Sequence, residues 1–286
     1  MKFENIKVYN FEGAFRGMRN PMNSWHLSDS YFGIVNTNHI YEDDTIAAQW
    51  CKSEGLSPLN YEEWDIKEKQ YSDWLVENGI LDNDEGQKSA VAAFIGPRDM
   101  QLAQKLVAGG PEHRKFLRQI IVSVDITAPI YWWKEFDTYK VGTVANSTST
   151  MHKLTSAPIT LDCFETEELD FVVETLKADL YMNEDDKPIY NLDTPWKISD
   201  IWDGIIEECE NLRKLYLRTK DKRYWKALIQ ILPESWLQTR TITLNYENLY
   251  AIAHQRSNHK LTEWSDDFVG FIKSLPYANE LIYFKG

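Results

Sequence analysis

Two segments of the 286-residue chain alternate apolar and polar residues, and long stretches with helical spacing separate them. Residues 121–126 read Ile-Val-Ser-Val-Asp-Ile, and residues 239–245 read Thr-Arg-Thr-Ile-Thr-Leu-Asn. Strict alternation is typical of a strand that buries one face. Strands that are so few and so far apart do not form a regular strand–helix repeat. The sequence therefore predicts an α+β fold.

The segments around these strands carry apolar residues at helical spacing. Pro97 lies near the start of one such segment, and Gly109 and Gly110 follow its last apolar residue, as expected at the two ends of a helix. Another predicted helix starts at Asn245. The helices predicted in this way are residues 96–110, 112–119, 167–180, 199–217, 245–256 and a last one from residue 262.

Residues 42–87 are rich in Asp and Glu and poor in Lys and Arg. Their aromatic residues, including Tyr61, Trp64 and Trp74, recur at roughly helical spacing. So many aromatic side chains are not typical of a disordered acidic tail. We therefore expect a peripheral helical insertion with an acidic solvent face.

The overall charge argues against two classes of partner. The chain has 31 Lys and Arg against 44 Asp and Glu, a formal net charge of −13. Nucleic-acid and anionic-membrane surfaces need clustered cations, so neither partner is expected. A small anionic ligand in a locally basic pocket remains compatible with this charge. No signal peptide or membrane span is predicted, because no long apolar run is present.

The cysteines and histidines predict neither a disulfide framework nor a metal site. The three cysteines are scattered without a paired motif, which favours reduced thiols and a cytoplasmic location. The six histidines do not pair at metal-ligand spacing. Nucleotide-binding glycine motifs are also missing: no GxGxxG follows a strand, and no phosphate-binding loop with a GKS or GKT end is found.

Two groups of residues could bind an anion. Arg114 and Arg118 would share one face of a helix, either as an anion clamp or as a solvated face paired with residues such as Glu112. The second group is the hydroxyl run, residues 146–150, which reads Asn-Ser-Thr-Ser-Thr. It could be a phosphate-binding loop with Lys140 supplying charge, or a surface turn. Its position after the most aromatic segment of the chain, which begins at Tyr131, favours the ligand loop.

The order of these segments resembles the flavin-dependent thymidylate synthases. In that family a histidine-led helix precedes a strand, an Ala-Pro-(Ile/Val)-aromatic step follows, and an Arg-His-Arg sequence and a serine-containing loop come next. Here residues 113–117, 121–126 and 128–131 follow the same order. Leu-Pro at 232–233, the strand at 239–245, the helix ending at Arg256 and a helix with Trp264 complete it. The resemblance covers most of residues 10–24 and 96–275.

The chain departs from the family at its most characteristic motif. Thr138, Tyr139 and Lys140 stand where the family has Arg-His-Arg, and Thr148 stands where it has serine. Ile229 occupies the place of the arginine that precedes Leu-Pro. Each lost arginine removes a bidentate anion contact. Other cations would have to compensate: Arg114, Lys115, Arg118, Lys134 and Lys140.

The resemblance assigns roles residue by residue. Arg256 resembles the arginine that holds the pyrimidine ring, and Asn245 resembles the flavin-contacting asparagine. The implied nucleotide-binding residues are Lys140, Ser147, Thr148, Ser149 and Arg256. The implied cofactor-binding residues are His113, Arg118, Val141 and Asn245, and Arg118 stands where the family often has an acid. No catalytic side chain is assigned, because in this family the protein mainly positions its substrates.

The implied fold is an antiparallel sheet flanked by long helices, in a single domain over residues 1–286 with the helical insertion at about 25–95. The implied cofactor is FAD, with reduced folate and NADPH if the enzyme is active, and the implied assembly is a homotetramer or homodimer. Three hypotheses follow. The protein methylates a pyrimidine nucleotide, or it is a non-catalytic nucleotide binder of phage or mobile-element type, or it is a scaffold whose pocket is filled by its own aromatic residues.

Overall fold

The computed structural model describes residues 1–36, 89–167 and 198–284. The chain divides into two compact units, each assembled from segments that are distant in sequence. Unit 1 comprises residues 1–126, 139–146 and 241–286, and unit 2 comprises residues 127–138 and 147–240. The single domain over residues 1–286 stays a prediction.

Four strands form one sheet in the order β1-β4-β6-β5. The two central strands are antiparallel: within unit 1 the Thr241 hydroxyl donates to Asp125 (2.5 Å), and within unit 2 the Thr127 and Thr239 hydroxyls lie 2.7 Å apart. Residue 125 thus lies opposite residue 241, and residue 127 lies opposite residue 239, as antiparallel pairing requires. The bounds are Lys2–Tyr9 for β1, Ile121–Pro129 for β4, Val144–Ser147 for β5 and Leu237–Asn245 for β6.

The buried face of β4 explains why the sequence alternates there. Val122, Val124 and Ile126 are fully buried, and the residues between them are only partly buried. Ile242 and Leu244 of β6 are buried in the same way. Both strands predicted from alternation are confirmed, with the first extended to Pro129 and the second beginning at Leu237.

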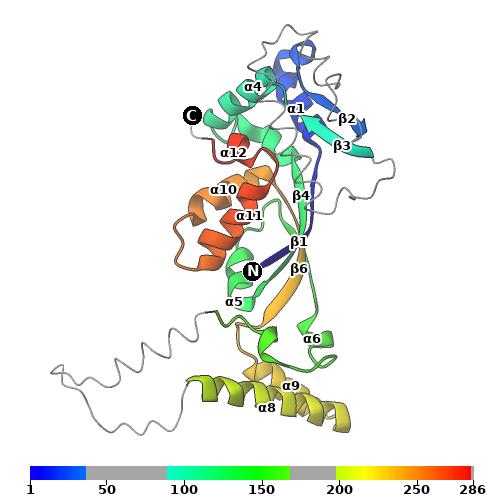
Figure 1. The fold of residues 1–286 in the computed structure, drawn as a ribbon, viewed down its shortest axis with the longest axis vertical. Helices are drawn as coiled ribbons and strands as arrows, with labels where there is room; N and C mark the ends of the chain where they lie inside the picture. The colour runs from blue at the N-terminus through cyan, green and yellow to red at the C-terminus, as the bar shows by residue number, and fades with distance from the viewer. Residues whose placement is uncertain (37–88, 168–197, 285–286) are drawn as a thin grey trace, which may run out of the picture. The chain divides into compact units, whose positions relative to one another are not determined.

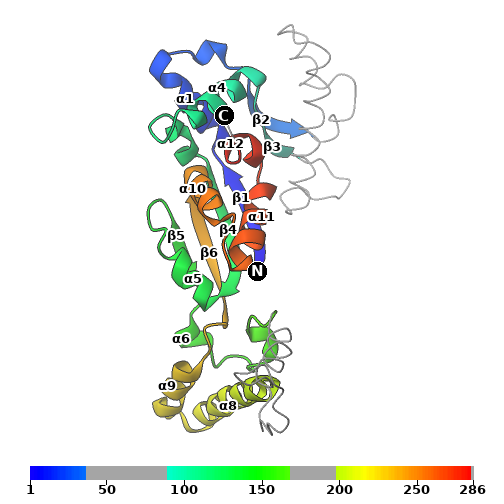
Figure 2. The same cartoon turned by 90° about the vertical axis from the view of Figure 1, so that its left-hand side faces the viewer.

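In unit 1, α10 and α11 pack side by side next to the sheet (Figure 1). The antiparallel pair β2–β3 lies in the same unit (Figure 2). The elements of unit 1 besides its strands of the sheet are α1 (Phe11–Arg19), η1 (Asn20–Met22), η2 (Trp25–Leu27), β2 (Tyr31–Asn36), β3 (Ser89–Phe94), α4 (Pro97–Ala108), η4 (Arg114–Gln119), α10 (Tyr246–Arg256), η6 (Glu263–Phe268), α11 (Val269–Ser274) and α12 (Ala278–Leu281).

A buried ionic cluster joins α1 to α4 at the start of the β2–β3 pair. Arg19 donates to Asp99 at 2.5 Å, and the hydroxyls of Ser28 and Ser30 donate to the other oxygen of the same carboxylate. Asp29 accepts from the backbone N–H groups of residues 98 and 99, at the first turn of α4. Because these charges are paired and hydrogen-bonded, their burial is tolerated.

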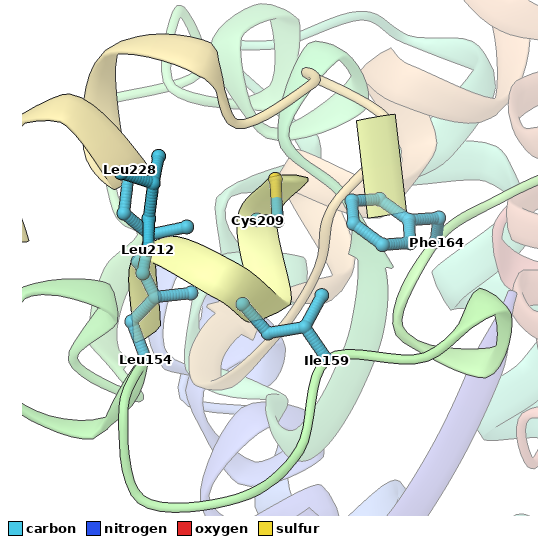
Figure 3. Packing of buried hydrophobic residues seen from close by; sticks show 6 residues of the cluster. All are labelled: Leu154, Ile159, Phe164, Cys209, Leu212 and Leu228. Atoms are coloured by element: carbon cyan, nitrogen blue, oxygen red, sulfur yellow. The ribbon is translucent and has the colours of Figure 1, made fainter. Parts of the chain in front are cut away.

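Unit 2 has its own apolar core, formed where α8 and α9 pack together (Figure 3). The core residues are Leu154, Ile159, Phe164, Cys209, Leu212 and Leu228. Burial raises the pKa of the Cys209 thiol to about 11, with Glu208 as a further cause, so the thiol stays neutral. Among its described residues, the helices of unit 2 are α5 (Ile130–Phe136), α6 (Thr150–Lys153), η5 (Leu161–Cys163), α8 (Ile198–Thr219) and α9 (Lys222–Ile231).

Most of the predicted helices that can be compared are confirmed. α4, α8 and α10 match the predictions for residues 96–110, 199–217 and 245–256 within a few residues, and the last helix begins as a π-helix at Glu263. One prediction is wrong in kind. Residues 112–119 do not continue α4 but form the separate 3₁₀ helix η4, because Gly110 adopts a positive φ of 95° and turns the chain.

Two predicted helical regions fall largely outside the described residues. The helix at 167–180 lies there except for its first residue, as do residues 42–87 of the insertion. The ends of the predicted insertion are described: after the short 3₁₀ helix η2, residues 31–36 and 89–94 form the paired strands β2 and β3 instead of helix. Aromatic and β-branched residues at 31–35 favour strand there. Among the described helices, none is long and apolar enough to cross a membrane.

Candidate functional site

The start of α10 is fixed by a reciprocal pair of asparagines. The Asn245 side chain accepts from the backbone N–H of Asn248 (3.0 Å), and the Asn248 side chain accepts from the backbone N–H of Asn245 (3.2 Å). Each amide thereby satisfies an N–H group that the helix itself leaves unpaired. The helix start predicted at Asn245 is confirmed, and Asn245 is its N-cap.

The same asparagines hold the turn of residues 139–144 against α10. The Asn248 side chain donates to the Val141 carbonyl at 2.7 Å. At Gly142, φ is +77°, and a Cβ there would lie 2.9 Å from the Asn248 side-chain oxygen. Only glycine suits both constraints. The turn exposes two apolar side chains to solvent, since Val141 is 87% and Val144 66% exposed.

At the other end of α10, Arg256 packs among aromatic rings. Its Nε donates to the Tyr139 hydroxyl at 2.6 Å, and that hydroxyl donates to Gln255 at 3.1 Å. The guanidinium carbon lies 5.4 Å from the centre of the Tyr139 ring and 4.8 Å from that of Trp264. Cation–π attraction and the hydrogen bond therefore fix Arg256 in place. Lys140, the next residue after Tyr139, is exposed.

The hydroxyl run is ordered by β6 within unit 2. Ser147 ends β5, the Thr148 N–H donates to the Thr239 carbonyl, and Thr150 begins α6. The expected ligand loop is therefore mostly an edge strand and a helix start. The neighbouring strand supplies backbone partners that the sequence pattern does not reveal.

A side-chain network extends from this run. The Gln238 amide donates to the Thr148 carbonyl (2.9 Å) and the Thr150 hydroxyl (3.2 Å), and it accepts from Arg240 Nε (2.9 Å). Arg240 also donates to Asp137 at 2.7 Å, and its guanidinium carbon lies 4.3 Å from the Trp133 ring centre. The one sequence signal for this network is that residues 238 and 240 share one face of a strand.

Two predicted cofactor-binding residues are exposed at the 3₁₀ helix η4: His113 directly precedes it, and Arg118 lies in its last turn. Between them, Arg114 pairs with Glu247 of α10 at 2.9 Å and lies 3.9 Å from the Tyr250 ring centre. The anion clamp of Arg114 and Arg118 is therefore not formed. Glu112, expected as a partner, pairs with Lys115 instead. Within the described ranges, no cluster of His, Cys, Asp and Glu could hold a metal ion.

Of the predicted site residues, the structure brings four to one helix and the turn beside it. Asn245 and Arg256 mark the two ends of α10, and Val141 and Lys140 lie in the turn docked on it. Ser147, Thr148 and Ser149 belong to unit 2. Tyr139 stands where the family pattern has a histidine, and its hydroxyl accepts a hydrogen bond from Arg256.

A scan against protein-family models finds no match, and a search of curated proteins also finds none. The solved structures give matches to flavin-dependent thymidylate synthase from Helicobacter pylori. One, complexed with FAD and dUMP, is 18% identical with a TM-score of 0.44 and covers 65% of this chain and 83% of its own. Another, with FAD and dUMP, is 15% identical with a TM-score of 0.51. That match covers 99% of this chain and 97% of the solved chain. This chain therefore has the fold of a flavin-dependent thymidylate synthase.

Proposed function

We propose that this protein binds a pyrimidine nucleotide and FAD and transfers a one-carbon unit to a dUMP-like substrate, as a divergent flavin-dependent thymidylate synthase. The observation that carries the proposal is the arrangement along α10. Asn245 lies at one end, Arg256 at the other, and the turn of residues 139–144 is docked alongside. A solved structure of the same fold is described with FAD and dUMP.

Arg256 is suited to a pyrimidine base. Its guanidinium lies against two aromatic rings, those of Tyr139 and Trp264, so it is held rigid before any ligand binds. A preorganised guanidinium loses little entropy when it donates to a ring carbonyl. Lys140 follows in the same turn and is exposed, so its ammonium would supply charge for a phosphate. Contacts from Ser147, Thr148 and Ser149 stay a prediction.

The residues of the turn fit a flat cofactor ring. The Val141 side chain is exposed, its carbonyl is held by Asn248, and Gly142 leaves no side chain above the asparagines. This turn would support the ring of FAD, while the Asn245 amide holds the helix start beneath it. Bound FAD would supply the reducing equivalents for the transfer. Reduced folate would supply the carbon unit and NADPH the electrons.

The nucleotide part of the proposal is tested by titrating dUMP into the purified protein and into the Arg256→Gln variant. Because hydrogen bonds to a charged group contribute about 1.5–3 kcal/mol, we expect the variant to bind about 10- to 100-fold more weakly. Arg16→Gln is the matched control, since Arg16 is an exposed arginine on α1. Equal losses in both variants would contradict the role of Arg256.

The flavin part is tested by the visible absorption of the protein as purified and after incubation with FAD. We expect a bound-flavin spectrum, and growth of a thymidine-requiring strain that expresses the protein. Gly142→Ala should lower FAD affinity, because the added methyl displaces the turn from Asn248. A protein that takes up no flavin under either condition would rule out the flavin enzyme. Light scattering measures whether it assembles as a homotetramer or homodimer.

A second candidate function is a non-catalytic nucleotide binder. It is favoured by Tyr139, which stands at the position of the family's histidine. The Tyr139 hydroxyl accepts a hydrogen bond from Arg256. Thermal stabilisation separates the two functions, because a ligand stabilises the folded state that binds it. Stabilisation by dUMP alone, with no further effect of FAD, favours the binder. Stabilisation by dUMP that requires FAD favours the enzyme.

A further inference from the structure

The tip of the α8–α9 hairpin carries a charge opposite to that of the whole chain. Residues 213–226, the basic tip, contain seven Lys and Arg among 14 residues and a single acid, Asp221. α8 ends at Thr219 and α9 begins at Lys222, so these cations gather where the two helices meet. The cations of the basic tip are Arg213, Lys214, Arg218, Lys220, Lys222, Arg223 and Lys226.

Several of these cations are not neutralised by the fold. Arg213 and Lys214 both pair with Glu210, and Arg223 pairs with Asp221. Arg218, Lys222 and Lys226 are exposed, and no acid among residues 198–284 or the other described ranges forms an ion pair with them. The basic tip therefore offers charge to an external anion.

Helix stability does not account for the cations at the start of α9. The N-terminus of a helix is electropositive, so a cation there costs about 0.3–1 kcal/mol, whereas an acid would stabilise it. Lys222 and Arg223 occupy the first turn, Lys226 follows one turn later, and that first turn contains no acid. Asp221 supplies the cap. Only Arg218, in the last turn of α8, suits its own helix dipole.

The turn between the helices also keeps a lysine where glycine is usual. Lys220 has a φ of +58°, and its N–H donates to the Tyr216 carbonyl in the manner of a helix C-terminal cap. A non-glycine residue in this conformation costs about 1 kcal/mol or more. Its ammonium lies 6.0 Å from the centre of the Tyr216 ring. A cation is thus retained at an energetic cost beside an aromatic plane.

The combination of free cations and partly exposed aromatic rings identifies the class of partner. Tyr216 and Tyr224 are both half-buried within the basic tip. Phosphates bind to cations, and unpaired bases stack on aromatic planes, which is how single strands are bound without sequence preference. An acidic protein segment would use only the cations. We propose that the basic tip binds single-stranded nucleic acid, a local exception to the expectation from the net charge of −13.

The test is fluorescence anisotropy of a labelled 20-nucleotide single-stranded RNA, and of DNA of the same sequence, with the full-length protein. We expect dissociation constants in about the micromolar range at low salt, weakening steeply as salt rises. The triple variant Arg218→Gln/Lys222→Gln/Lys226→Gln should bind about tenfold more weakly or worse. In a plot of log affinity against log salt concentration, each phosphate contact on a single strand contributes a slope of about −0.7. Loss of three contacts should therefore make the slope of the triple variant less negative by about 2.

The matched control is Lys7→Gln/Lys105→Gln/Lys260→Gln, which removes the same charge from exposed lysines of unit 1. It should retain affinity within about twofold, and circular dichroism should show that both variants fold. Absence of binding by the natural chain, or equal losses in the two variants, would overturn the proposal. So would stronger displacement of the RNA by polyglutamate than by unlabelled RNA, because that outcome indicates an acidic protein partner.

Discussion

Glu210 links the stability of unit 2 to acid pH. Its carboxylate accepts two bonds from Arg213 and one from the Ile159 N–H. The hydrogen bond from Arg213 is the main reason that the pKa of Glu210 falls from 4.5 to about 2, against the opposing effect of burial. The same contact raises the pKa of Arg213. The ion pair connects α8 to residues 155–159, because Arg213 also donates to the Thr155 carbonyl.

The depressed pKa predicts a loss of stability in acid. The folded state binds this proton more weakly than the unfolded state, so the contribution of Glu210 is complete above pH 4.5 and disappears as the pH falls toward 2. Thermal unfolding followed over that range should show a smaller decrease for Glu210→Gln than for the natural chain. A decrease of the same size in both proteins would show that other carboxyls control acid unfolding.

Individual residues also mark the limit of prediction from sequence. The resemblance placed Asn245 and Arg256 correctly at the two ends of one helix, because both lie in a continuous pattern. The contact of Arg256 with Tyr139 joins residues 117 apart, and no local spacing reveals it. The pairing of Arg114 with Glu247 was missed for the same reason.

At the scale of elements, α10 depends on the asparagine pair at its start. Replacing Asn245 by Ala removes the acceptor for the Asn248 N–H and should lower the free energy of unfolding by about 1 kcal/mol. Urea denaturation measures this loss. Asn245→Ser, which can still cap the helix, should restore most of the stability. If flavin affinity falls in the serine variant as well, the amide has a role in binding FAD beyond that of capping the helix.

The strands differ in how far their sequence reveals them. β4 buries every second residue along most of its length, and β6 does so between Thr241 and Leu244, so alternation predicts both strands. β1 buries only Ile6, and Asn5 interrupts it with a φ of 52°, so no alternation remains. All four residues of β5 are exposed. Strands without a buried face are defined by their hydrogen-bonded neighbours, which hydrophobic spacing does not encode.

At the scale of the whole molecule, the net charge of −13 opposes the compact state through self-repulsion. Raising the salt concentration from about 0.01 to 0.15 M shortens the screening length from about 30 to 8 Å. We therefore expect the melting temperature at pH 7 to rise by about 2–4 °C over that range, as measured by calorimetry. Near the sequence pI of about 5.0 the increase should vanish. A decrease at pH 7 would mean that attractive ion pairs dominate.

The neutral, buried thiol of Cys209 is a chemical probe of how often the core of unit 2 opens. In a chain carrying Cys51→Ser and Cys163→Ser, it is the remaining cysteine, and it sits in the core of α8 and α9. A thiol reagent can reach it only when that core opens, and the raised pKa keeps the closed form unreactive. The labelling rate therefore reports the opening of the unit 2 core, and its change in a Glu210→Gln background measures how far the Glu210–Arg213 ion pair keeps that core closed.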